Sequence, residues 1–133
     1  MRCVAITPEK TVVDQEVEFI VLPLYDGEFG IGENRAPVVG RLGAGEMRLT
    51  LKGGSVERWW VEGGFVEVVD NATTLLANRV VELSSLTVEG AKEELRKALS
   101  RPSNTPELSK SKEGAVQRAR TRLRYAEKIA SAK

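Results

Sequence analysis

The side chains that most often carry out catalysis are scarce in this chain of 133 residues. It contains no histidine and one cysteine, Cys3. Without histidine the chain cannot build a Ser-His-Asp triad or the usual zinc site, and with one cysteine it cannot form an intrachain disulfide. The adjacent carboxylates of Glu93 and Glu94 lie in a segment with helical spacing, where we expect both to be solvated. We therefore predict that the chain is not an enzyme and has no catalytic residue and no metal site.

Glycine-rich segments could instead form a phosphate-binding loop. Gly63 and Gly64 are adjacent, and residues 27–32 are also rich in glycine. A phosphate loop needs a following Lys-Ser or Lys-Thr pair between a strand and a helix, and neither segment has one. Because glycine also allows the positive φ angles of tight turns, we predict a hairpin turn at Gly63 and Gly64.

Basic residues are concentrated near the end of the chain. Between residues 109 and 133, eight basic residues accompany two acidic ones, so this segment carries a charge of +6 and the rest of the chain −5. On a helix, Arg120, Arg124 and Lys128 would form one row, and Arg118 with Arg122 a second. Such rows either face solvent or dock onto an acidic surface, because guanidinium groups pair well with carboxylates.

The first two thirds of the chain predict β structure. Residues 46–52 alternate between apolar and polar side chains, and Val17, Phe19 and Val21 repeat the pattern against Glu16 and Glu18. This alternation is typical of a strand with one buried face. Many short strands separated by turns favour an antiparallel sandwich or barrel. The further strand candidates are residues 3–7, 11–13, 55–61, 65–69, 73–77 and 80–83.

The last third predicts two helices. Apolar residues recur at three- and four-residue steps over residues 88–99 and again over residues 115–130, which is the spacing of amphipathic helices. We predict a β-sandwich domain at residues 1–85 and a helical hairpin at residues 86–133, with helices at about 87–100 and 113–131. No apolar run approaches the roughly 18 residues that a membrane span needs. The N-terminal apolar run is too short for a signal peptide, so we expect the protein to stay in the compartment where it is made.

Four stretches resemble those of one known family. They are ITPEK at residues 6–10, DGEFGI at 26–31 with APVV at 36–39, GGFVEV at 63–68 with TLLA at 74–77, and QRARTRL at 117–123. In this order and spacing they resemble the epsilon chain of F-type ATP synthases, and the resemblance covers essentially the whole chain.

This resemblance implies a fold and a role. The fold is a sandwich of about ten antiparallel strands followed by an antiparallel two-helix hairpin. The role is that of a non-catalytic central-stalk subunit of a proton-translocating rotary ATP synthase, which couples the gamma subunit to the c ring. The helices would also reach the catalytic alpha and beta subunits and inhibit ATP hydrolysis. Candidates for that inhibitory contact are Arg118, Arg120, Arg122 and Arg124.

The resemblance also identifies candidate interface residues. Asp26, Glu28, Phe29 and Arg35 match positions that are expected to meet the c ring or the gamma subunit. Family members commonly carry proline and histidine just before the Ala-Pro pair, whereas this chain has Glu33 and Arg35 there. We expect the loop to form, with a different charge pattern toward the ring.

Some members of the family bind ATP in the folded hairpin. They do so through an acidic residue and an arginine at the start of the first helix. In the matching stretch, LTVEGA at residues 86–91, Thr87 replaces the acid and Gly90 replaces the arginine. Because Thr87 carries no charge and Gly90 has no side chain to bind phosphate, we expect no ATP site and no other cofactor.

The resemblance implies a peripheral location, on the cytoplasmic face of a bacterial inner membrane or, alternatively, the stromal face of a plastid thylakoid. A different function class fits the composition alone. A small β-barrel with a basic helix could bind nucleic acid. The net acidic β part and its few aromatic residues argue against base stacking, so we expect no nucleic-acid partner.

Overall fold

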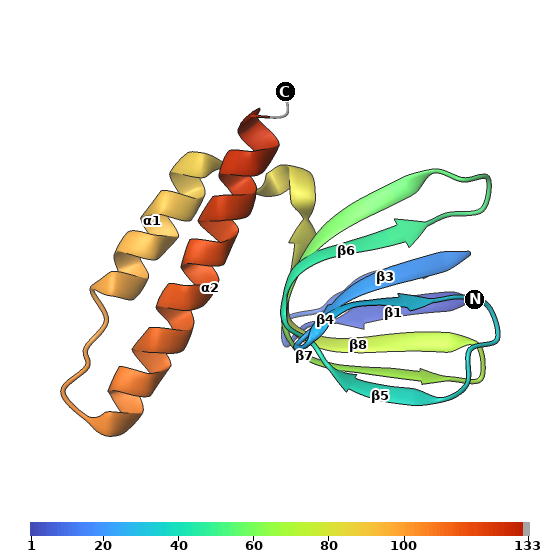
Figure 1. Ribbon diagram of the computed structural model, residues 1–133, viewed down its shortest axis with the longest axis horizontal. Helices are drawn as coiled ribbons and strands as arrows, with labels where there is room; N and C mark the ends of the chain where they lie inside the picture. The colour runs from blue at the N-terminus through green and yellow to red at the C-terminus, as the bar shows by residue number, and fades with distance from the viewer. Residues whose placement is uncertain (132–133) are drawn as a thin grey trace. The chain divides into compact units, whose positions relative to one another are not determined.

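The computed structural model describes residues 1–131, so Lys133, the last residue of the basic segment, lies outside the described residues. The chain divides into two compact units, Met1–Leu83 and a second that begins at Ser84. The first unit is built of strands and the second of helices (Figure 1). In chain order the elements are β1 (Arg2–Ile6), β2 (Thr11–Glu16), β3 (Phe19–Leu24), β4 (Gly27–Ile31), β5 (Val38–Arg41), β6 (Ala44–Thr50), β7 (Val56–Val69), β8 (Ala72–Glu82), the 3-10 turn η1 (Leu83–Ser85), α1 (Val88–Leu99) and α2 (Pro106–Ser131).

The strands form one hydrogen-bonded sheet that closes around a single core. Their order is β2-β1-β8-β7-β6-β3-β4, and β5 pairs with β7 off this path. The pairing is antiparallel except between β1 and β8, which run parallel. Buried residues from both ends of the path, Val13 of β2 and Ile31 of β4, belong to the same hydrophobic cluster as Met47 and Leu49 of β6. The sheet therefore folds over on itself, which confirms the predicted β-sandwich followed by two helices.

The structure has eight strands where the family resemblance implied about ten. The difference comes from β7 and β8, which are 14 and 11 residues long. Each of them joins two strands that the sequence patterns had separated. β7 pairs with β6 through Val56–Glu62 and with β5 through Phe65–Val68, so one strand serves both halves of the sandwich.

The predicted hairpin turn at Gly63 and Gly64 is wrong, because both residues lie inside β7. They do have positive φ angles, +63° and +101°, and they form a bend within the strand. At this bend the Gly63 N–H donates to the carbonyl of Gly43 at 3.1 Å, and the Leu42 N–H donates to the carbonyl of Gly64 at 2.9 Å. Glycine is therefore needed here to change the partner of the strand and not to end it.

Both helices begin at a threonine cap. The Thr87 hydroxyl accepts a hydrogen bond from the Gly90 N–H at 3.1 Å in front of α1. The Thr105 hydroxyl accepts one from the Leu108 N–H at 3.1 Å in front of α2. α2 therefore starts at Pro106, seven residues before the predicted start, because proline lacks the N–H that the first helical position leaves unpaired.

Small side chains line the face along which the hairpin packs. α1 buries Ala91 and Ala98, and α2 buries Ala119, Arg122 and Ala126. In α2 these residues are three, four and seven positions apart, so they share one face of the helix. Alanine lets helices approach closely but contributes little buried area per residue, and Arg122 is the exception in this otherwise apolar stripe.

Candidate functional site

The four predicted interface residues lie on β4 and on the segments that flank it. Asp26 is exposed in the turn before β4, where Gly27 adopts a φ of +135°. The Glu28 carboxylate is 62% exposed and accepts a hydrogen bond from Arg48 of β6 at 3.2 Å. The structure therefore displays both acidic side chains to solvent at one end of the strand.

Phe29 and Arg35 are brought together. Phe29 packs partly against the core, and the Arg35 guanidinium lies 4.7 Å from the centre of its ring. A cation over an aromatic face is stabilised by the quadrupole of the ring. The stacking holds the arginine over β4, with its charge still exposed to solvent.

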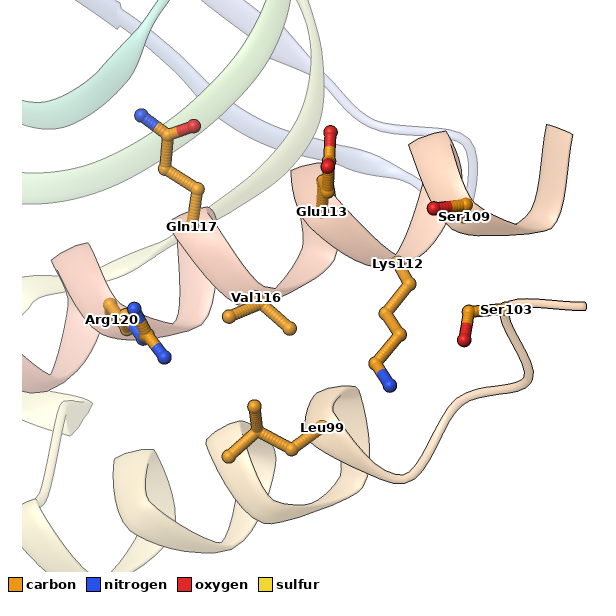
Figure 2. Close-up of a pocket in the computed structure, with 8 residues that line it drawn as sticks. All are labelled: Leu99, Ser103, Ser109, Lys112, Glu113, Val116, Gln117 and Arg120. Carbon is orange, nitrogen blue, oxygen red and sulfur yellow. The ribbon is translucent and has the colours of Figure 1, made fainter. Parts of the chain in front are cut away.

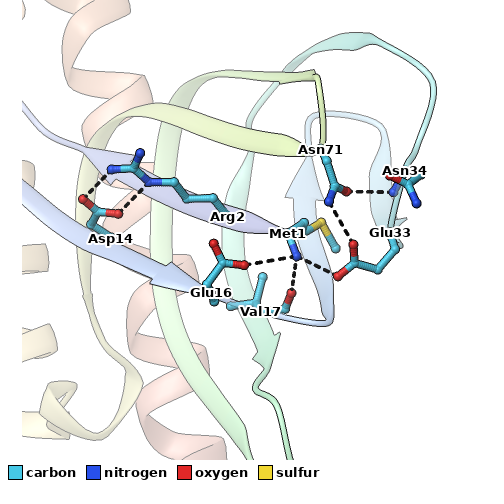
Figure 3. Close-up of polar contacts among 8 residues, drawn as sticks. All are labelled: Met1, Arg2, Asp14, Glu16, Val17, Glu33, Asn34 and Asn71. Carbon is cyan, nitrogen blue, oxygen red and sulfur yellow. Dashed lines mark hydrogen bonds and ion pairs between the residues drawn. The ribbon is translucent and has the colours of Figure 1, made fainter.

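Glu33, the other departure from the family pattern, anchors the loop after β4 (Figure 3). Its carboxylate accepts hydrogen bonds from the Met1 ammonium at 2.6 Å and from the Asn71 side-chain amide at 3.0 Å. Asn71 in turn accepts from the Asn34 N–H at 2.8 Å. The Met1 ammonium, followed by Asn71, lowers the pKa of Glu33 below its usual value. The same hydrogen bond raises the pKa of the ammonium. The loop therefore forms without the family's proline, through a polar network.

An exposed apolar surface lies on the outer side of β5, β7 and β8, and sequence analysis missed it. Phe65 and Leu76 are direct cross-strand partners and are 57% and 58% exposed. Val39 and Val69 lie on the same side, because Val39 pairs with Glu67, two residues from Phe65 and Val69. Tyr25 extends the surface through Arg41, whose guanidinium lies 4.7 Å from the ring centre. We call these five residues the apolar face: Tyr25, Val39, Phe65, Val69 and Leu76.

A contiguous group of exposed apolar side chains marks an interaction surface more often than isolated ones do. The signal that could have revealed it is the alternation in residues 65–69. Val66 and Val68 point into the core, so Phe65 and Val69 must point out. Leu76 joins them only through the pairing of β7 with β8, which is a non-local fact.

The predicted arginines of α2 fall into two environments. Arg118, Arg120 and Arg124 are exposed. Arg122 is buried, with its Nε and Nη1 atoms shielded from solvent, and it forms an ion pair with Glu94 of α1. The prediction that Glu93 and Glu94 are both solvated is therefore wrong for Glu94, which is half-buried, whereas Glu93 is exposed and pairs with Arg96.

A shallow groove lies between the end of α1 and the first half of α2 (Figure 2). Leu99 and Val116 face each other across it, and Lys112 and Arg120 flank them. The groove combines apolar contact with positive charge. Its lining is Leu99, Ser103, Ser109, Lys112, Glu113, Val116, Gln117 and Arg120.

The residues at the start of α1 are occupied in capping. The Thr87 hydroxyl is the cap acceptor, and a Cβ at Gly90 would lie 2.8 Å from that oxygen.

Burial raises the pKa of the Cys3 thiol to about 12, so the thiol is protonated at neutral pH. Within residues 1–131 no cluster of three acidic or cysteine side chains could hold a metal ion. No helix in this range is long and apolar enough to cross a membrane.

Comparisons with known proteins decide the family. Residues 1–83 match the family model for the β-sandwich domain of the ATP synthase delta/epsilon chain. The ATP synthase epsilon chain of Rhodopirellula baltica is 44% identical over 124 residues, which are 93% of this chain and 96% of that protein. This chain belongs to the ATP synthase epsilon family. It is accordingly a non-catalytic subunit of ATP synthase, and the family assignment favours this function over nucleic-acid binding.

Further relatives support the epsilon assignment. The epsilon chain of Syntrophomonas wolfei is 37% identical over 92% of this chain and 91% of its own length. The sodium-ion-specific epsilon chain of Propionigenium modestum is 32% identical over 92% and 90%.

Solved structures share the epsilon fold at low sequence identity. A chain of the Euglena gracilis mitochondrial ATP synthase, in a structure of OSCP, F1 and the c-ring, has a TM-score of 0.68 at 21% identity and covers 98% of this chain and 79% of that chain. A chain of the Tetrahymena thermophila central stalk and c-ring has a TM-score of 0.66 at 16% identity, covering 97% and 95%.

Proposed function

We propose that this epsilon chain joins the gamma subunit to the c ring in the central stalk of a proton-translocating ATP synthase and restrains ATP hydrolysis through α1 and α2. The membership of the family supports the proposal, as do fold relatives that come from a central stalk with a c-ring. The observation that carries it is the apolar face, since a subunit that works inside a complex needs a surface for stable association.

The gamma subunit is the proposed partner of the apolar face. Side chains such as Phe65 and Leu76 gain most from a partner that excludes water from them, because buried apolar area drives association. Aromatic residues are also enriched at the energetic centres of interfaces. Arg41, which stacks on Tyr25, offers a charged rim at the edge of this surface.

The c ring is the proposed partner of the exposed end of β4. The charges there come from Asp26, Glu28 and Arg35, and the Arg35 guanidinium stacks on the ring of Phe29. Charged groups suit a contact with polar loops, where complementarity sets orientation and specificity more than raw affinity. Glu28 already pairs with Arg48, so a ring contact would share or replace that exposed pair.

Restraint of hydrolysis is assigned to the basic side of α2. The helix has 26 residues and so spans about 39 Å at 1.5 Å per residue, which is a long reach for a helix that swings away from α1. Arg118, Arg120 and Arg124 would meet acidic groups of a catalytic beta subunit, with Arg122 joining them once it leaves Glu94. The chain would act at the cytoplasmic face of a bacterial inner membrane, attached through the complex, and without an ATP ligand of its own.

The test measures binding of the full chain to purified gamma subunit. Replacing Phe65 and Leu76 together by glutamate should weaken binding at least about tenfold, because charged groups would be buried without partners. Val56→Glu is the matched control, since Val56 is also in β7 and 48% exposed but lies outside the apolar face. The control should bind like the unmodified chain. Failure of the unmodified chain to co-elute with gamma at micromolar concentration would overturn the proposal.

A further inference from the structure

Arg122 differs from every other basic residue of α2 in the described part of the chain. It is 9% exposed, whereas Arg118, Arg120 and Arg124 face solvent. Its charge is matched by Glu94, which projects from α1. The ion pair therefore bridges the two helices, and its two members come from positions 28 residues apart in the sequence.

This pair sits in a packing face that is otherwise weak. The neighbours of Arg122 on the same side of α2 are Ala119 and Ala126, which bury little area. A guanidinium is costly to hold out of water unless a carboxylate compensates it, and removal of one partner leaves an uncompensated buried charge. The closed hairpin therefore depends strongly on Glu94, because loss of this one carboxylate would leave the buried charge of Arg122 uncompensated.

We propose that the Glu94–Arg122 pair is a latch that keeps the hairpin closed and withholds Arg122 from other acidic partners. In the closed hairpin Glu94 neutralises Arg122 internally. When α2 separates from α1, the guanidinium becomes available and can pair with a carboxylate elsewhere, while Glu94 becomes solvated. Glu94 is then an internal competitor for the arginine, and this part of the inference rests on the restraint of hydrolysis proposed above.

The latch predicts opposite effects for its two members. Glu94→Gln should open the hairpin more readily but keep Arg122, so hydrolysis by the reconstituted complex should be restrained more strongly, about twofold or more. Arg122→Gln should also loosen the hairpin but remove the gripping group, so hydrolysis should rise. Glu93→Gln is the matched control, because Glu93 is exposed and pairs only with Arg96 of its own helix among the contacts described.

Amide hydrogen exchange in the full chain tests the latch without the complex. Exchange along α2 should be about tenfold faster in Glu94→Gln, because loss of a half-buried pair partner favours the open state, and unchanged in Glu93→Gln. Equal exchange in these two variants would overturn the latch.

Hydrolysis separates the latch from the proposed function. If Glu94→Gln exchanges faster but does not change hydrolysis, while removal of both helices raises it, the competition for Arg122 is overturned. If removal of both helices also leaves hydrolysis unchanged, the proposed restraint itself fails, and the exchange result still decides whether the latch exists.

Discussion

Replacing Gly64 by alanine should destabilise the β unit far more than the same change at another glycine with the same backbone angle. The φ of Gly64 is +101°, and a Cβ there would overlap the Leu76 carbonyl and lie 2.8 Å from the Cα of Ala77. These are backbone atoms of the paired strand and cannot rotate away. The strained φ costs about 1–3 kcal/mol, and forcing the strands apart adds about 1–3 kcal/mol.

Gly54→Ala is the matched control. The φ of Gly54 is +94°, but no atom lies within 4 Å of the position that a Cβ would take. Gly54→Ala should therefore destabilise the β unit only through the strained φ, by about 1–3 kcal/mol. An 83-residue unit at 0.05–0.15 kcal/mol per residue has a free energy of unfolding of about 4–12 kcal/mol. Gly64→Ala should destabilise the β unit by about 2–6 kcal/mol in total, so the variant should be only marginally stable.

The assay is urea unfolding followed by tryptophan fluorescence. Both tryptophans of the chain, Trp59 and Trp60, lie in β7, so the signal reports on this unit. The unfolding midpoint should fall further for Gly64→Ala than for Gly54→Ala. Equal losses for the two variants would refute the argument that the close approach of β7 to β8 requires glycine.

Three further predictions concern the helices, the N-terminal network and nucleotide binding. Cutting the chain after Leu83 should leave the β unit folded, because its hydrophobic cluster lies entirely within residues 1–80, and ATP hydrolysis by the reconstituted complex should rise. Replacing all four arginines between residues 118 and 124 by alanine should give part of that rise. Unchanged hydrolysis in both variants would contradict the proposed restraint. Glu33→Gln should lower the thermal midpoint most between pH 4.5 and 8.0, the ordinary pKa values of the two partners. Because the pKa of Glu33 is lowered in the folded state, its contribution to stability is lost as the pH falls through this lowered pKa. Because the pKa of the Met1 ammonium is raised, its contribution to stability is lost as the pH rises through this raised pKa. If the difference in thermal midpoint between the unmodified chain and Glu33→Gln does not narrow toward acid pH, the result would count against the ion pair. Titration calorimetry of the full chain with ATP should show no saturable heat, because Thr87 is occupied as a cap and Gly90 has no side chain; one-to-one binding at sub-millimolar ATP would contradict this.

Local patterns in the sequence were sufficient to predict the fold class. Alternation over residues 46–52 is the burial alternation of β6, in which Met47 and Leu49 are fully buried. The three- and four-residue spacing predicted both helices. These features depend on neighbours within one element, and such neighbours can be read from a single sequence.

The features that were missed depend on pairing between distant segments. Whether Gly64 ends a strand or bends it is decided by the approach of Leu42 and Ala77 from other parts of the chain. Arg122 has the same spacing as its solvated neighbours, and its burial follows from the position of Glu94 on another helix. The start of α2 was misplaced for a local reason, because the apolar spacing that predicted the helix begins at residue 115, whereas the helix itself begins at Pro106, a residue suited to the first helical position.

The continuity of β7 and β8 has a mechanical consequence. A sandwich made of two separate sheets resists sliding only through side-chain contacts, which can slip. Here the antiparallel ladder from Trp59–Glu82 to Val69–Ala72 runs through both halves, so sliding one half against the other requires breaking backbone hydrogen bonds that load together. A subunit built on two such continuous strands should resist shear up to a threshold and then yield abruptly, which would suit the proposed role of joining the gamma subunit to the c ring.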